Sequence, residues 1–290
     1  MTKILNKIID PHLHIFNMQK GDYFWLKPQS PPFWPDKHLI NKDFIEADVM
    51  LNPPNQLAAF VHIEAGFDNQ QPWREIDWLE QHCTLPFKSV AFADITAATF
   101  AEHIHLLKQR QSVTGIRHLL DDQAESILSS PLIHRTFSLL AELELSFDAQ
   151  MSLVDSRAVE LLVALASQHK TMGIIINHAG WAPEENNVNA RKQWKLNLAK
   201  IAKCENIAIK LSGWEMSSRT WQPQHVSTVI QDCLTLLGET RVMLASNFPL
   251  CLFSMSYTEL WNTYAELPDI SAQCFENIIF SNAKHWYSLN

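Results

Sequence analysis

Glycine is scarce in this sequence, with 7 glycines among 290 residues. A dinucleotide-binding sheet needs a Gly-x-Gly-x-x-Gly turn after a strand, because only glycine lets the backbone come close to the phosphates. No such turn follows any of the hydrophobic segments that could form strands. The sequence therefore argues against an open, doubly wound sheet that binds a dinucleotide.

Cysteine pairs and basic clusters are missing as well. The five cysteines are odd in number and scattered, without a Cys-x-x-Cys pair, which argues against a disulfide framework and a thiolate zinc site. The 23 Lys and Arg residues stand against 31 Asp and Glu residues, which gives a formal net charge of -8. Since no dense run of Lys or Arg could neutralise a row of phosphates, nucleic acid is not expected as a partner.

Long hydrophobic runs are also absent. A membrane span needs roughly 18 or more apolar residues, and no segment approaches that length. The apolar part of residues 1–10 is too short for a secretory signal. We therefore expect a soluble, cytoplasmic protein with no membrane partner.

What the sequence does contain is a series of short apolar, β-branched segments. Several of them are continuously hydrophobic rather than alternating, as strands of a parallel sheet covered on both faces should be. The candidate strands are Lys7–Phe16, Ala58–Ala65, Ser89–Ile95, Val113–Leu120, Leu145–Met151, Met172–Ala179, Ile207–Ser212 and Arg241–Ser246.

Amphipathic segments lie between these strands. Each is long enough for a crossover helix: Pro72–His82, Thr99–Arg110, Ser130–Leu143, Ser156–His169, Asn189–Cys204 and Gln222–Leu237. Strand and helix thus alternate along the chain. This pattern predicts the α/β class and a single (β/α)₈ TIM-barrel domain over residues 1–290, in which the first and last strands are hydrogen-bonded neighbours.

A long insertion separates the first two predicted strands. It covers residues 17–55 and is rich in proline and tryptophan. A long loop with aromatic side chains inside a compact domain is usually functional. We therefore interpret residues 17–55 as a lid that covers the substrate.

Polar side chains close several predicted strands, at the end where such a barrel carries its site. The first strand ends in Asp-Pro-His-Leu-His, and the period of two places His12 and His14 on the same side. Two imidazoles so placed can chelate a metal ion or flank one substrate atom. Other polar residues at or near strand ends are His62, Glu64, Arg117, Gln150, His178 and Asn247.

A series of short motifs extends along the chain. They are Asp-Pro-His-Leu-His at 10–14, Val-His-Ile-Glu-Ala at 61–65, Gly-Ile-Arg-His at 115–118, Phe-Asp-Ala-Gln at 147–150, Asn-His-Ala-Gly at 177–180, Lys-Leu-Ser-Gly at 210–213, Ala-Ser-Asn-Phe-Pro at 245–249 and Phe-Ser-Asn-Ala at 280–283. In this order they resemble the amidohydrolase-related TIM-barrel hydrolases, the amidohydrolase 2 group with its 2-pyrone-4,6-dicarboxylate and sugar-acid lactonases, over essentially the whole chain. The resemblance implies a hydrolytic site built from His12, His14, His178 and a carboxylate on the eighth strand, with Arg117 binding an anionic substrate.

One position departs from this pattern. The resemblance implies an aspartate on the eighth strand, where this chain has Asn247, and no neighbouring residue in the sequence replaces it. An amide neither accepts a proton near neutral pH nor gives a metal a charged ligand. We therefore expect either no metal or one weakly bound divalent ion, with zinc as the first candidate, on His12, His14 and His178, and with Glu64 as an alternative anionic ligand.

Together with this resemblance, the residues predict a hydrolase that acts on a small carboxylic ester or lactone with an anionic group, such as a sugar-acid or aromatic-degradation lactone. His12, His14, His178 and Asn247 are the predicted catalytic residues, and Arg117, Gln150, His62, Lys210 and Trp181 the predicted substrate contacts. Two alternatives stay open: a zinc-dependent decarboxylase or hydratase of aromatic acids, and a barrel that binds a ligand without converting it. The sequence also leaves open whether the chain is a monomer or a homo-oligomer.

Overall fold

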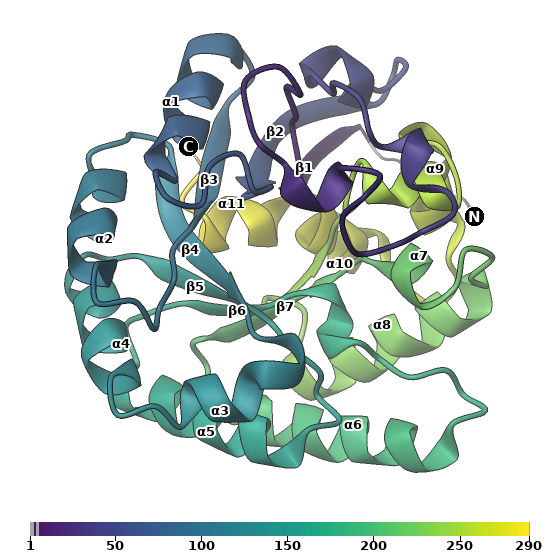
Figure 1. The fold of residues 1–290 in the computed structure, drawn as a ribbon. Coiled ribbons are helices and arrows are strands. Elements are labelled where there is room, and N and C mark those ends of the chain that lie inside the picture. Colours follow the sequence, from purple (N-terminus) through teal and green to yellow (C-terminus); the bar gives the residue numbers. More distant parts are fainter. Residues whose placement is uncertain (1–2, 4–5, 290) are drawn as a thin grey trace.

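The computed structural model describes Lys3 and residues 6–289, and its core is one eight-stranded sheet (Figure 1). Each strand pairs in parallel with the next strand of the chain. This is the single-domain (β/α)₈ barrel that the sequence predicted. The strands are β1 (Lys7–Leu13), β2 (Gln56–Ile63), β3 (Phe87–Phe92), β4 (Val113–Leu119), β5 (Ser146–Gln150), β6 (Ile174–Ile176), β7 (Ile207–Leu211) and β8 (Val242–Leu244).

The barrel closes between β1 and the residues that follow β8. The backbone amide of Asn247 donates to the carbonyl of His12 at 2.9 Å, and the amide of His14 donates to the carbonyl of Phe248 at 2.7 Å. Leu13 and Phe248 form a parallel bridge. The predicted pairing of the two ends is thus confirmed, although the backbone hydrogen bonds begin just after Ser246. As a result, Asn247 lies beside the histidines of β1.

Helices follow the strands and surround the barrel (Figure 1). The predicted crossover segments agree within a few residues with α1 (Trp73–His82), α2 (Phe100–Lys108), α4 (Ile133–Glu142), α5 (Ser156–Gln168), α6 (Val188–Ile201) and α8 (Pro223–Leu237). Sequence reasoning missed α3 (Ala124–Leu128), α7 (Trp214–Ser217), α9 (Tyr257–Glu266), α10 (Ala272–Glu276) and α11 (Asn282–Trp286). None of the described helices has the length and apolar character that crossing a membrane requires.

Apolar side chains form two clusters, one on each face of the sheet. The larger cluster joins strands, outer helices and the insertion. The smaller cluster fills the barrel interior, where Ala283, Tyr287 and Leu289 of the C-terminal segment join side chains of the strands. In Figure 1, α10 and α11 lie behind the strands, opposite the insertion that follows β1. The C-terminal segment therefore closes the amino end of the barrel and leaves the carboxyl end for a site.

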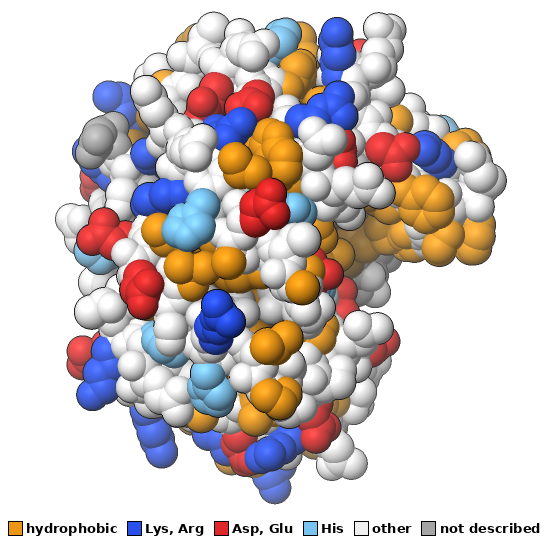
Figure 2. Space-filling view, turned by 60° about the vertical axis from the view of Figure 1, so that its left-hand side comes forward, with side chains coloured by type: hydrophobic (Ala, Val, Ile, Leu, Met, Phe, Trp, Pro, Cys, Tyr) orange, Lys and Arg blue, Asp and Glu red, His pale blue; other side chains and the backbone are white. Residues whose placement is uncertain are grey.

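The insertion after β1 extends over the carboxyl end of the barrel. It contains short helices η1 (Phe24–Leu26), η2 (Lys37–Leu39) and η3 (Glu46–Val49). Two contacts attach it: Trp25 Nε1 donates to the carbonyl of Ala65 at 2.7 Å, and Asp36 forms an ion pair with Arg219 at 2.7 Å. Figure 2 shows a projecting part that is rich in hydrophobic side chains on the right of the view. The turn from Figure 1 moves the insertion towards this side.

Candidate active site

A cavity of about 1130 Å³ opens at the carboxyl ends of the strands. The insertion contributes one wall, with Phe24, Trp25 and Trp34 among its side chains. The predicted site residues that line the cavity come from strand ends and the turns that follow them: His14, Glu64, Arg117, Gln150, His178, Trp181 and Asn247. Sequence reasoning had placed all of these residues at the carboxyl end, and the fold brings them into one cavity.

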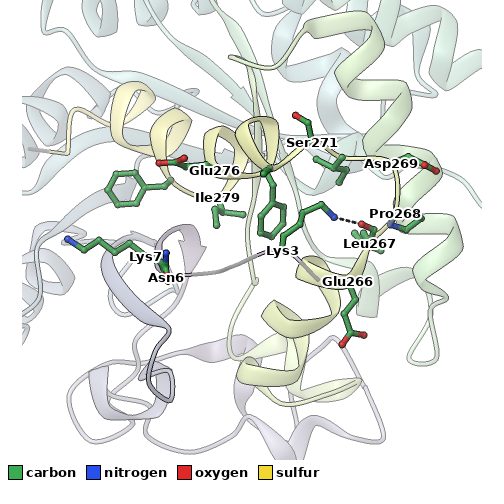
Figure 3. Close-up of a pocket in the computed structure, with 14 residues that line it drawn as sticks. Lys3, Asn6, Lys7, Glu266, Leu267, Pro268, Asp269, Ser271, Glu276 and Ile279 are labelled. Carbon is green, nitrogen blue, oxygen red and sulfur yellow. Dashed lines mark hydrogen bonds between the residues drawn. The ribbon is translucent and has the colours of Figure 1, made fainter. Parts of the chain in front are cut away.

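A second cavity, of about 1280 Å³, lies at the opposite end of the barrel (Figure 3). Its walls are the start of β1 and residues 266–280, and the Lys3 ammonium at its edge donates to the carbonyl of Leu267. No predicted site residue lines this cavity. Since functional groups of such barrels sit at the carboxyl ends of the strands, we place the candidate site in the first cavity.

His12, His14 and His178 form one cluster. The ring centroid of His12 lies 5.2 Å from that of His14 and 4.6 Å from that of His178. His14 comes directly after β1 and His178 begins the short helix η5 (His178–Gly180) two residues after β6, so both lie beyond the strand ends and not within the longer strands that the sequence predicted. The closing of β1 against the β8 end brings the three rings together.

Hydrogen bonding fixes the tautomer of His14. Its Nδ1 lies 2.7 Å from the carbonyl oxygen of Ile63, and because a carbonyl can only accept, Nδ1 carries the proton. Nε2 then carries the lone pair, and it has no hydrogen-bond partner among the described residues. Burial, and next the nearby Arg117 charge, holds the pKa of His14 well below its usual value. His14 is therefore a neutral imidazole with a free basic nitrogen at the cavity.

His178 is held by contacts on both sides. Its Nδ1 lies 3.1 Å from the hydroxyl of Ser212, and the ring of Trp181 lies 4.8 Å away at an interplanar angle of 30°. Burial, and next the charge of Arg117, keeps the pKa of His178 well below its usual value. Gly213 makes this packing feasible, because a Cβ atom there would lie 2.7 Å from His178 Nδ1.

His12 is the most enclosed of the three histidines, with no exposed surface. Neither of its ring nitrogens has a hydrogen-bond partner in the part of the chain that the structure describes. Burial, and next the charge of Lys210, lowers the pKa of His12 well below its usual value. Buried polar atoms are rarely left unpaired, so the two ring nitrogens of His12 are atoms of the cluster that can still form hydrogen bonds.

Backbone strain gathers around the same cavity. His178, Trp181 and Asn247 have positive φ values of 54°, 54° and 58°, respectively. Non-glycine residues persist in this region only where the surrounding structure holds them, and such strain is common at functional sites.

Arg117 lines the cavity but already has protein partners. Its Nε donates to the carboxylate of Glu64 at 2.8 Å, Nη2 donates to the carbonyl of Glu64 at 2.9 Å, and Nη1 donates to Gln150 Oε1 at 3.2 Å. Burial raises the pKa of Glu64, and the Arg117 charge opposes that rise. Nη2 also lies 2.8 Å from the Glu64 carboxylate, so of the five N–H donors of the guanidinium one, on Nη1, remains for a ligand. Glu64 is thus engaged as the counter-ion of Arg117.

Asn247 contacts a carboxyl group that sequence reasoning missed. Its Nδ2 donates to Glu215 Oε1 at 2.5 Å, and Glu215 belongs to the short helix α7 that follows β7. Glu215 is almost fully buried, and burial raises its pKa to about 7. The signal in the sequence was the position of Glu215, four residues beyond the end of β7, at the same end of the barrel as Asn247.

Two predicted substrate contacts, His62 and Lys210, do not line the cavity. His62 Nε2 lies 3.1 Å from the Glu75 carboxylate, and its Nδ1 accepts from the backbone amide of Ile15. The Lys210 ammonium is fully buried and lies 2.5 Å from the Asp148 carboxylate. Partners within the fold use the polar atoms of these two residues, and their contact with a substrate stays a prediction.

The donor set does not match a tightly held metal ion. Among the described residues, no three His, Cys, Asp or Glu side chains converge in a way that could hold a metal. The strand-eight position offers the amide of Asn247, and Glu64 is paired with Arg117. The unpaired nitrogens of His12 and the Nε2 atoms of His14 and His178 are neutral donors without a charged ligand beside them. Three imidazoles alone can hold a catalytic zinc ion where their geometry is preorganised, so these residues would form a weaker donor set than the same histidines with a carboxylate beside them.

We expect the purified protein to contain well under one zinc ion per chain. Asn247→Asp should bind zinc more tightly than the natural sequence, because it adds a carboxylate next to Glu215 and close to His12. Elemental analysis of protein purified without chelator, and zinc titration by calorimetry, would check both statements. A full equivalent of zinc in the natural protein, lost on replacing His12 or His14, would contradict them.

Comparisons with known proteins identify the family of this chain. The Amidohydrolase family model matches residues 9–289. The uncharacterized protein y4mH of Sinorhizobium fredii is 28% identical over 90% of this chain and 91% of that protein. The L-fucono-1,5-lactonase of Burkholderia multivorans is 23% identical over 87% of this chain and 85% of that protein. A crystal structure of a Burkholderia multivorans amidohydrolase with bound zinc has a TM-score of 0.79 at 19% identity, and the match covers 98% of this chain and 99% of that one. Since the family model spans nearly the whole chain, this protein belongs to the amidohydrolase family.

Proposed function

We propose that this chain hydrolyses a small carboxylic ester or lactone that carries an anionic group. The observation that carries the proposal is the tautomer of His14, which presents a neutral, basic Nε2 to a cavity lined by a second imidazole and a guanidinium. Ester hydrolysis needs a proton acceptor for water and donors for the developing oxyanion. The similarity to an L-fucono-1,5-lactonase supports a sugar-acid lactone as the first substrate to try.

The proposed reaction uses side chains of this chain only. A water oxygen attacks the carbonyl carbon while His14 Nε2 accepts one proton from the water. If the Ser212 hydroxyl donates to His178 Nδ1, then His178 Nε2 carries a hydrogen that can donate to the oxyanion. The bond from the carbonyl carbon to the ring oxygen then breaks, and protonated His14 returns its proton to the leaving alkoxide. The product is a hydroxy acid, which ionises at neutral pH.

In this proposal the insertion covers the bound substrate. Trp25 and Trp34 line the cavity from the insertion, and the contacts of Trp25 with Ala65 and of Asp36 with Arg219 hold it over the barrel end. Apolar walls around the ester would lower the local dielectric and strengthen the hydrogen bonds to the oxyanion.

A panel of sugar-acid and aromatic-acid lactones, followed with a pH indicator, tests this function. We expect saturable acid release from at least one lactone. Thermal unfolding with the same compounds separates a second outcome, because a barrel that only binds its ligand would gain thermal stability without releasing acid. That outcome across the panel would overturn the proposal of hydrolysis.

Arg117→Met should raise KM for an anionic lactone. Loss of one charge-assisted pair costs about 1.5–3 kcal/mol, so the expected rise is roughly 10- to 100-fold. A neutral ester should be affected much less, and steady-state kinetics with both compounds would measure the difference. The matched control is Arg74→Met, since Arg74 lines the same cavity but its side chain is half exposed and paired with Asp68. Equal effects on both substrates would make Arg117 a structural residue that supports Glu64.

A further inference from the structure

A buried hydrogen bond joins the side chains of Asn247 and Glu215. An asparagine amide can present either its oxygen or its NH₂ group to a cavity. Here Nδ2 donates to Glu215 Oε1, and the Asn247 side chain also lines the cavity. Because the NH₂ group is directed to Glu215, Oδ1 remains as the atom that can accept a hydrogen bond in the cavity.

The backbone around Asn247 leaves the amide little freedom to move. Its amide nitrogen donates to His12, its carbonyl accepts from Leu250, and its φ of 58° is in the left-handed region. On the other side, the carbonyl of Glu215 accepts from Arg219, and Trp214 Nε1 donates to the Tyr264 hydroxyl at 2.8 Å. Both partners are therefore anchored independently of the hydrogen bond between them.

The identities of the two residues depend on each other. If residue 247 were an aspartate, two carboxyl groups would face each other across this distance, and both could not be ionised at once. With an amide at 247, the single carboxyl group sits one side chain further from the cavity. The one carboxyl group of this pair is therefore that of Glu215, which reaches the end of the eighth strand from α7.

We infer that Glu215 is a positioning residue that holds the Asn247 amide with Oδ1 towards the cavity, where it accepts a hydrogen bond from the attacking water. This inference rests on the proposed hydrolysis, in which His14 takes the proton of that water. Orientation of the water by Oδ1 would point an oxygen lone pair at the carbonyl carbon. The inferred role explains why the natural chain can carry an amide at 247.

The way in which Glu215 holds the Asn247 amide depends on its ionisation. An ionised carboxylate only accepts hydrogen bonds, whereas a protonated one can also donate to Asn247 Oδ1. The ionisable groups that face it are Arg219 beyond α7, Cys251 of η6 (Leu250–Phe253) and Tyr264 of α9. The pKas of Cys251 and Tyr264 are raised well above their usual values by burial, so both stay neutral near pH 7. Of these groups, Glu215 alone should change its charge near neutral pH.

A cycle of four proteins tests the inference: the natural chain, Glu215→Gln, Asn247→Asp, and the double variant. The double variant exchanges amide and carboxylate and keeps the hydrogen bond. We expect each single variant to lose roughly 10- to 100-fold in kcat with little change in KM, and the double variant to recover to within about fivefold of the natural chain. In the natural chain kcat should rise with pH as Glu215 ionises. Glu215→Gln should not show this rise. Glu142→Gln, an exposed carboxyl on α4, is the matched control.

Thermal unfolding of the same four proteins tests the pairing of residues 215 and 247 without relying on the proposed hydrolysis. Between pH 5 and pH 8, Asn247→Asp should lose stability relative to the natural chain as the pH rises, because its two facing carboxyl groups can both ionise in the unfolded chain but not in the folded one. The double variant should not show this loss. That result would support the pairing even if no lactone in the panel were hydrolysed. Additive effects in both the kinetic and the thermal cycle, or a natural pH profile in Glu215→Gln, would overturn the inference.

Discussion

Replacing His14 with glutamine should lower kcat for lactone hydrolysis by about 10²- to 10⁴-fold, the usual contribution of a general base. Glutamine can still donate to the carbonyl of Ile63, but it has no basic nitrogen to face the cavity. In the natural protein the loss of rate that comes from protonation of His14 should begin only well below pH 6.5, because the pKa of His14 is lowered and the base form persists on acidification, whereas the change near pH 7 comes from Glu215. Steady-state rates from pH 4.5 to 8 would measure both effects.

The control for this variant is His105→Gln, an exposed histidine on α2 far from the cluster. It should retain the natural rate. If His14→Gln kept kcat within tenfold of the natural value while His178→Gln lost it, the roles of the two imidazoles would have to be exchanged.

Replacing Lys210 with methionine should lower the free energy of unfolding by about 3–5 kcal/mol. Lys210 and Asp148 are both fully buried, so loss of the ammonium leaves a carboxylate without a counter-ion inside the barrel. The Tyr287 hydroxyl donates to Asp148 at 3.1 Å, but it supplies no charge. Urea denaturation of the variant and the natural protein would give the difference.

Two further variants test whether the loss of stability in Lys210→Met comes from the carboxylate that it leaves without a counter-ion. Lys195→Met removes a half-exposed partner of Asp232 and should cost at most about 1 kcal/mol. Lys210→Met combined with Asp148→Leu should recover much of the loss, since an apolar pair of similar volume needs no counter-ion. Unchanged stability in Lys210→Met together with a raised KM would restore the earlier prediction that Lys210 contacts the substrate.

The barrel was predictable because its strands carry a direct physical signature. A parallel strand covered on both faces must be apolar along its whole length, as Ile174–Ile176 is, and the polar residue that ends such a strand lies at the barrel mouth. This reasoning located His14, Arg117 and His178 in one cavity. It did not locate α9, α10 and α11, because the predicted helices were segments between two strands and no further strand follows β8.

The placement of His62 and Lys210 away from the cavity lining has a different cause. Alternation shows which residues of a strand share a face, but not which face points inward. The interior cluster contains Val61 and Ile63, so His62 points outward to Glu75 of α1. Lys210 points inward, but Asp148 holds it within the barrel. Glu215 was missed because it reaches Asn247 from a helix of four residues, and a contact across 32 positions of the chain leaves no local pattern.

The central claim is that the imidazoles of this site carry out ester hydrolysis without a metal ion. The most direct test is the rate of acid release from a lactone substrate by one protein preparation before and after chelator treatment, with zinc content measured in the same samples. Our account predicts an unchanged rate at well under one zinc per chain. A tightly held ion on His12, His14 and His178, whose removal abolishes the activity and whose return restores it, would contradict the account.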